Sequence, residues 1–279
     1  MRVIELSPRF PGMCGWVLLV LLLAGMSGKA WGSGINTDVA MTPNRDGGIF
    51  RLRLIAEEGD IKTPGTEVDG LSVSATVAYG LRANLALFLN VPYVRREGKM
   101  SAGASAVDQG IADFTIFGKY RFIQRDTGPI DTQRWAWIGG VNVRSGDSDV
   151  SSESVDPLGG VVYSLQRGRS HVDADLLYQI NTGSGASGDD VLRYDAAYSY
   201  RVYPERFKPG KAYSLETVAE LNGHYTTDGS HTVFVSPGLQ YHLERWTFET
   251  SLQLPVFQDV APNRVETDYR VLAGFRFHF

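Results

Sequence analysis

Apolar and polar side chains alternate with a period of two along the last fifteen residues, Val265 to Phe279. Side chains on a β-strand point to its two faces in turn, so the pattern predicts a strand with one aromatic face and one charged face. Such a strand suits a position between lipid and a wet lumen. A soluble sandwich also shows alternation, but a charged face opposite an aromatic carboxy-terminus is more typical of a membrane barrel.

The same alternation recurs along the chain. In one segment, Leu192, Tyr194 and Tyr198 share a face opposite Arg193 and Asp195. Most of these segments are close to the ~9–11 residues that a tilted strand needs to cross the hydrocarbon. The pattern predicts an all-β fold, a transmembrane antiparallel up-and-down β-barrel of about 12 strands. The predicted strands are residues 48–58, 69–80, 84–96, 111–124, 134–145, 157–167, 171–182, 191–203, 212–226, 231–243, 245–258 and 265–279.

The connections support a membrane barrel. Tight turns are expected at 81–83, at 168–170 and at Glu244, whereas the connections at 145–156 and 183–190 are longer and rich in Gly, Ser and Asp. Outer-membrane barrels have short periplasmic turns and longer outer loops. We read the second of these loops as a flexible outer loop and not as a phosphate-binding loop, because it lacks the lysine and the helix of that motif.

Two prolines, Pro237 and Pro255, interrupt the strand pattern. Proline lacks the N–H that a central strand donates to its neighbour. We therefore expect bulges or strand ends near the rim at both positions.

Residues 1–32 have the features of a secretory signal peptide. A basic start precedes an apolar run from Trp16 to Ala24, and the small residues Ala30 and Gly32 suit cleavage after either of them. The run is shorter than the ~20 residues of a spanning helix, which disfavours an uncleaved anchor. We expect export through a cleaved signal and insertion into the outer membrane of a Gram-negative bacterium.

The rest of the chain divides into a leader, residues 33–46, and a barrel, residues 47–279. The leader is polar and is bounded by Pro43 and two glycines. It either lies in the lumen as a plug or stays in the periplasm. Its composition favours a disordered periplasmic leader.

Composition excludes several kinds of chemistry. The only cysteine, Cys14, lies in the predicted signal peptide, so the mature chain has neither disulfides nor thiol chemistry. A net charge of −4 argues against a nucleic-acid partner. The five histidines lack metal-ligand spacing, and we expect no metal and no cofactor.

The inward faces of the predicted strands carry many charges. Unpaired charge is costly to bury, so these side chains must be hydrated in a lumen or paired across strands. A structural ladder of ion pairs and a role in selecting solutes both remain open. Phe117, Phe234 and Phe257 are expected inside as well. The candidate lumen-lining residues are Arg51, Arg53, Asp113, Lys119, Arg121, Arg193, Asp195, Glu216, Glu220, Glu249, Glu266, Asp268, Arg270 and Arg276.

A catalytic site is not indicated. Membrane-embedded hydrolases use a serine–histidine pair with an orienting amide or carboxylate, and here His224, Asn222 and Ser236 are the nearest match. Serine and histidine are scattered throughout the chain, so this match is weak. We predict no catalytic residues and no enzyme activity.

Several segments resemble the outer-membrane family named for the meta-pathway of phenol degradation, whose members are regarded as transporters. The most specific are Val235-Ser-Pro-Gly-Leu-Gln-Tyr and Gln253-Leu-Pro-Val-Phe-Gln-Asp, followed by Glu266-Thr-Asp-Tyr-Arg. The likeness covers nearly all of the mature chain. It implies a barrel and a passage for small, aromatic or hydrophobic compounds. Where relatives often have Pro-Thr-Gly-Asp, this chain has Arg144-Ser-Gly-Asp, and no role is carried over there.

The last strand also resembles the signal read by the barrel-assembly machinery. Gly274, Phe277 and Phe279 stand at the expected spacing, although Leu272 replaces the usual polar residue. The sequence therefore predicts a porin-like channel for passive uptake of small molecules, with outer-membrane lipid, the assembly machinery and a small solute as partners. A non-conducting structural or surface-interaction barrel is the alternative, and a lipid-acting barrel enzyme is a weaker one.

Overall fold

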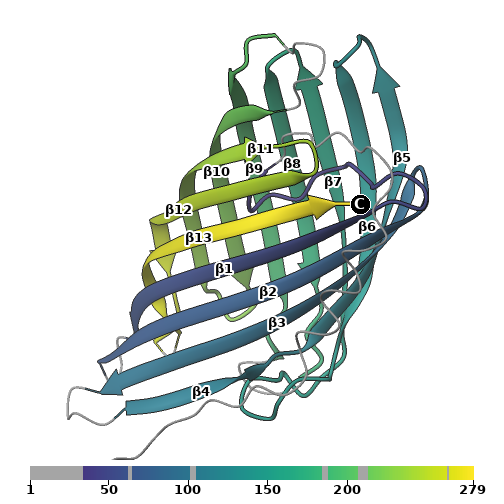
Figure 1. Ribbon diagram of the computed structural model, residues 1–279. Helices are drawn as coiled ribbons and strands as arrows, with labels where there is room; N and C mark the ends of the chain where they lie inside the picture. The colour runs from purple at the N-terminus through teal and green to yellow at the C-terminus, as the bar shows by residue number, and fades with distance from the viewer. Residues whose placement is uncertain (1–33, 62–64, 101–104, 184–187, 207–212, 263) are drawn as a thin grey trace, which may run out of the picture.

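The computed structural model describes residues 34–61, 65–100, 105–183, 188–206, 213–262 and 264–279. The predicted signal peptide lies outside these residues. The described chain forms one antiparallel sheet that curls into a closed barrel (Figure 1). Its strands are β1 (Gly48–Ile61), β2 (Thr66–Arg82), β3 (Leu85–Met100), β4 (Ser105–Ile111), β5 (Phe114–Asp126), β6 (Thr132–Val143), β7 (Asp156–Arg167), β8 (Ser170–Gln179), β9 (Val191–Tyr203), β10 (Ser214–Thr226), β11 (His231–His242), β12 (Trp246–Asp259) and β13 (Glu266–His278).

The barrel wall has twelve strand positions, because β4 and β5 share one. Residues Leu85–Asn90 of β3 pair with β5, and Tyr93–Lys99 of the same strand pair with β4. Closure comes from the pairing of β13 with β1 and of β2 with β3. The predicted twelve-stranded antiparallel barrel is confirmed. The sequence pattern missed residues 105–110 of this strand position because Ala112 and Asp113 interrupt the alternation.

Burial in this barrel is the reverse of that in a soluble protein. Trp137 is 54% exposed and Val256 is 60% exposed on the outside, whereas Asp173 is only 1% exposed inside. An apolar exterior suits acyl chains, and closure of the sheet pairs most of the strand backbone that would otherwise face the hydrocarbon. Among the described residues no helix is long and apolar enough to span a membrane.

Two bulges change which side chains face inward. The register between β11 and β12 passes from Val233–Phe257 to Phe234–Pro255, so Val256 is an extra residue. The interpretation of Pro255 as a bulge site is confirmed. Phe257 is half exposed on the outer face, where its ring lies 5.1 Å from that of His231, so the expectation of a lumenal Phe257 is wrong.

A second bulge lies near the outer end of β13. Glu58 pairs with Tyr269 and Gly59 with Thr267, which leaves Asp268 as the extra residue. Thr267 is buried inside and donates a 2.7 Å hydrogen bond to Glu57. Because one inserted residue reverses the facing of its neighbours, Glu266 and Asp268 do not line the lumen, contrary to the sequence-based prediction.

Candidate functional site

The amino-terminal segment lies inside the barrel. Residues 34–42, here called the plug, run across the interior as the dark purple trace behind β13 and β1 in Figure 1. Ile35 and Ala40 are both 0% exposed. Of the two positions that the sequence left open for the leader, the structure therefore shows the lumenal one for this segment. The expectation of a disordered periplasmic leader is therefore wrong for these residues. Local composition could not reveal the lumenal position, because the residues that hold the plug lie far away in the sequence.

Carboxylates on one side of the lumen accept the plug's N–H groups. Glu220 of β10 accepts from the backbone N–H of Ile35 at 2.9 Å and of Thr37 at 3.1 Å. Its other oxygen accepts from the backbone N–H of Asn36 at 3.0 Å and from the side-chain Nδ2 of the same residue at 2.7 Å. Successive N–H groups around one anion form a nest, which is a strong binding arrangement for a carboxylate. Glu220 therefore holds the first turn of the plug.

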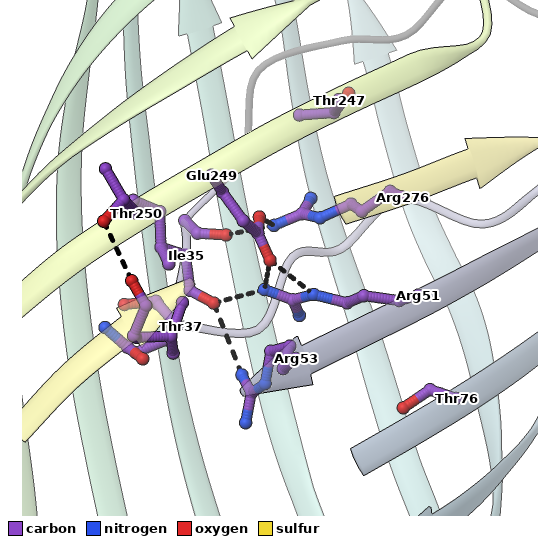
Figure 2. Close-up of polar contacts among 12 residues, drawn as sticks. Ile35, Thr37, Arg51, Arg53, Thr76, Thr247, Glu249, Thr250 and Arg276 are labelled. Atoms are coloured by element: carbon purple, nitrogen blue, oxygen red, sulfur yellow. Dashed lines mark hydrogen bonds and ion pairs between the residues drawn. The ribbon is translucent and has the colours of Figure 1, made fainter. Parts of the chain in front are cut away.

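Arginines on the other side donate to the plug's carbonyl groups. Arg51 Nη2 donates to the Ile35 oxygen at 2.5 Å (Figure 2). Arg276 Nη2 donates to the Gly34 oxygen at 2.9 Å. Both arginines also bind Glu249, with nitrogen–oxygen distances of 2.7 and 2.6 Å. Acids on β10 and bases on β1 and β13 thus hold opposite edges of the same backbone.

The strand register explains why Glu249 lies between the two arginines. Arg51 and Arg276 are directly opposed on β1 and β13, a like-charge pair that needs a counter-ion. Glu249 on β12 pairs with Gly274. A Cβ atom at Gly274 would lie 3.0 Å from Glu249 Oε1, so glycine gives the carboxylate its room. Gly274, singled out for assembly, therefore also has a local packing role.

Apolar packing and further polar contacts complete the plug site. Ile35 packs against buried Val218 and Leu272. This contact accounts for Leu272, which stands where the assembly signal usually has a polar residue. Further along the plug, Lys119 Nζ donates to the Val39 oxygen at 2.9 Å and lies 3.1 Å from Asp38 Oδ1. Leu272, the one apolar residue on the charged face of the last strand, is the sequence signal that could have pointed to this site, but it was interpreted only as a departure from the assembly signal.

A cavity of about 1380 Å³ remains in the lumen beside the plug. Its charged lining is strongly basic, although the whole chain has a net charge of −4. Ten basic residues line it: Arg45, Arg51, Arg53, Lys119, Arg121, Arg134, Arg193, Arg245, Arg270 and Arg276. Only two acidic residues do so, Asp38 and Asp195. Glu216, Glu220 and Glu249 are buried and are absent from this lining, so most of the charged side chains that face the cavity are basic, although Glu249 neutralises part of the charge of Arg51 and Arg276 from behind.

The sequence missed three of the basic lining residues. Arg45 follows the plug, Arg134 is the third residue of β6 and Arg245 lies in the turn before β12. Strand parity gives no signal for side chains at strand ends or in connections. The cavity also has an aromatic part, because Phe88 and Phe117 line it and stack with ring centroids 4.6 Å apart.

Asp113 has a different environment from the one predicted. It lies in the break between β4 and β5, and its carboxylate anchors the outer loop after β6. Ser145 and Gly146 donate their backbone N–H groups to it at 3.0 and 2.9 Å, and Ser152 donates both N–H and hydroxyl at 2.7 Å. Burial raises the pKa of Asp113, but the hydrogen bonds from Ser152, Ser151 and the two amides outweigh it and lower the pKa to about 2.

This loop anchor predicts a pH dependence. A lowered pKa means that ionised Asp113 stabilises the folded loop above the ordinary value of 3.8, and that this contribution is lost as the pH falls through about 2. We expect pepsin cleavage within residues 145–155 to rise as the pH falls between these values. In the Asp113→Asn variant this rise in cleavage should be absent, because the loop lacks the ionised anchor at every pH. A rise in cleavage of the same size in the variant would contradict the role of Asp113.

The weak serine–histidine match does not form a catalytic arrangement. Ser236 Oγ donates to Asn222 Oδ1 at 2.7 Å, and its cross-strand partner is Glu220. His224 is opposite Thr232, four residues along the strand from Ser236, which corresponds to roughly 13 Å. No group of three His, Cys, Asp or Glu among the described residues is placed to hold a metal ion.

A closed antiparallel sheet of twelve strand positions with an apolar exterior and a charged interior defines the class: the chain has the fold of an outer-membrane β-barrel. It is similar to a crystal structure of an outer membrane channel from Pseudomonas putida F1, with a TM-score of 0.59 and 12% identity over 90% of this chain and 100% of that one.

Two further solved structures share the fold. The β domain of the Bordetella autotransporter BrkA has a TM-score of 0.51 at 11% identity over 84% of this chain and 100% of its own. The NanC porin has a TM-score of 0.50 at 12% identity over 82% and 98%. No family model matches the chain, and a search of curated proteins finds no significant relative. The resemblance to the meta-pathway family stays a prediction.

Proposed function

We propose that this protein is a passive outer-membrane channel for small molecules and that its lumen favours anions. The observation that carries this proposal is the excess of basic over acidic side chains around the cavity. A charged cleft with low-dielectric walls raises the local concentration of ions of opposite sign. Rings of basic side chains select anions in other pores by the same electrostatics.

The cavity also suits solutes that contain an aromatic ring. The stacked pair of Phe88 and Phe117 offers an apolar surface, and Lys119 Nζ lies 5.0 Å from the centre of the Phe88 ring. A ring that carries a carboxylate has both an apolar face and a negative charge, and both have counterparts here. We therefore place small aromatic acids among the solutes of the channel.

The plug limits the passage in this proposal. It is bound along its length by side chains of β1, β5, β8, β10 and β13, so it narrows the lumen as long as these contacts persist. The proposal assigns no catalytic role to the barrel. It includes insertion by the barrel-assembly machinery through Gly274, Phe277 and Phe279, together with export by the amino-terminal signal.

Ion selectivity in planar bilayers tests the channel. With a KCl gradient, the wild-type reversal potential should show preference for chloride. Arg193 points into the cavity with its side chain 47% exposed, so Arg193→Glu should reduce that preference. Reversing one charge in a water-filled lumen changes the energy of a passing ion by about 1 kcal/mol, which is a factor of about five in the permeability ratio.

Arg167→Glu is the matched control, because Arg167 is exposed at the end of β7 and does not line the cavity. It should leave the reversal potential unchanged. Equal shifts of the reversal potential in the two variants would show that the position of Arg193 in the lumen does not cause the selectivity. A complete lack of conductance in the wild type would favour a structural or surface-interaction barrel instead.

A further inference from the structure

The barrel wall has a seam between β12 and β13. Their ladder runs from Trp246–Phe277 to Gln253–Arg270 and goes no further among the described residues. The next residues of β12 pair with β11, up to His231–Asp259. On the other side, β13 stays paired with β1 as far as Asp60–Glu266. The two strands therefore separate over their outer ends, while each remains attached to its other neighbour.

The sequence accounts for this separation. Pro255 has no N–H to donate, and it lies two residues beyond the last β12–β13 pair. Val256 is the extra residue of a bulge, which bends and twists the strand that contains it. Asp268 is the extra residue of the bulge on β13. Bulges thus lie on both edges of the seam.

One side chain closes the seam in place of a backbone ladder. Gln258 Nε2 donates to the Thr267 oxygen at 2.7 Å, and the Thr267 N–H donates to Gln258 Oε1 at 2.9 Å. An unsatisfied backbone group is costly at membrane depth, and these two hydrogen bonds satisfy the backbone oxygen and the backbone N–H of Thr267. A glutamine side chain has three rotatable bonds, unlike a strand backbone fixed by a continuous ladder. Beyond the last ladder pair, opening of the seam would therefore require the loss of these two hydrogen bonds and of no strand ladder.

The seam separates the lumen from lipid. Gln253 and Arg270, its last paired residues, line the cavity together with Phe234, and Arg270 lies over the Phe234 ring at 4.7 Å. On the outside, Leu254 and Val256 are exposed apolar side chains. The lumenal side of the seam therefore carries Gln253 and Arg270 beside the Phe234 ring, and its outer side carries apolar side chains.

We propose that the seam between β12 and β13 is a lateral exit through which small, uncharged apolar solutes pass from the lumen into the bilayer when Gln258 releases Thr267. Charged solutes are excluded from this route because moving a charge into hydrocarbon is costly. The exit rests on the proposed function only in that the solute must reach the cavity. It is a second route, separate from the passage of anions along the lumen.

The test locks the seam in the full-length chain. Gln258→Cys and Thr267→Cys, in a Cys14→Ser background, are joined by a short bis-maleimide. Uptake of N-phenyl-1-naphthylamine, a neutral aromatic probe that fluoresces in lipid, is followed in intact cells. Chloride conductance of the same purified variant is measured in planar bilayers. We expect locking to reduce uptake to the rate of cells without the protein and to leave the conductance unchanged.

The control pair is Ala196→Cys with Leu221→Cys, which are directly opposed on the continuously paired strands β9 and β10. Cross-linking it should change neither measurement. Persistent uptake with the seam locked, equal loss in the control, or no uptake by the wild type above cells without the protein would each overturn the lateral exit. A wild type with uptake but without conductance would overturn the channel for anions and leave the lateral exit standing.

A single substitution gives an independent measurement if the cysteine pair does not fold, as judged by heat-modifiable gel mobility. Gln258→Ala removes both hydrogen bonds to Thr267. We expect at least a threefold faster uptake of the probe. An unchanged or slower rate in a folded Gln258→Ala barrel would overturn the proposal.

Discussion

Glu220→Gln is expected to raise the single-channel conductance several-fold. The carboxylate of Glu220 accepts from three consecutive backbone N–H groups and one side-chain amide of the plug. Glutamine loses the negative charge, and its NH₂ group turns a donor toward these donors. Hydrogen bonds to a charged group contribute about 1.5–3 kcal/mol each, so losing about 3 kcal/mol would raise the population with a released plug roughly a hundredfold.

Recordings in planar bilayers measure this directly, with Asp268→Asn as the control. Asp268 is also a carboxylate and lies on the same barrel, but it is exposed on the outer side of a bulge and binds no plug atom in the described structure. Its variant should conduct like the wild type. If Glu220→Gln also conducts like the wild type, the plug does not control the passage. Deletion of residues 34–42 should then have no effect either.

Glu249→Gln is expected to lower the stability of the barrel by about 3 kcal/mol, the size of effect seen when one partner of a buried ion pair is removed. The Glu249 side chain is fully buried and is the shared partner of Arg51 and Arg276. Without it, two opposed arginines repel each other at the closure of β13 on β1. The midpoint of urea unfolding, followed by the loss of heat-modifiable gel mobility, measures the change.

Asp69→Asn is the matched control for Glu249→Gln. Asp69 also pairs with a basic residue at short range, 2.5 Å from Lys99 Nζ, but that pair is largely exposed. An exposed ion pair contributes about 0–1 kcal/mol, so the midpoint should barely move. Equal shifts in the two variants would show that the burial of Glu249 between the arginines is not what stabilises the closure.

Much of the wall follows from local alternation. Residues 191–203 were predicted as a strand from the segregation of tyrosines and charges, and β9 spans Val191–Tyr203. A period-two pattern reports a strand reliably here because lipid and lumen demand opposite side chains at every position. The pattern fails where one residue is inserted. Asp268 and Val256 each shift the facing of their neighbours, and alternation alone does not reveal an unpaired residue.

The sequence by itself determined a twelve-stranded barrel with an apolar exterior and charges inside. Tertiary structure decided the position of the plug, the basic cavity and the seam at Gln258. Residues Gly34 to Ala40 are polar or small apart from Ile35 and Val39, and they have no strand pattern of their own. Their partners Ser164, Asp173, Glu220 and Arg276 lie 124 to 242 residues away in sequence. Only closure of the sheet brings these side chains around one backbone, so their joint effect on charge and on passage is a property of the closed barrel.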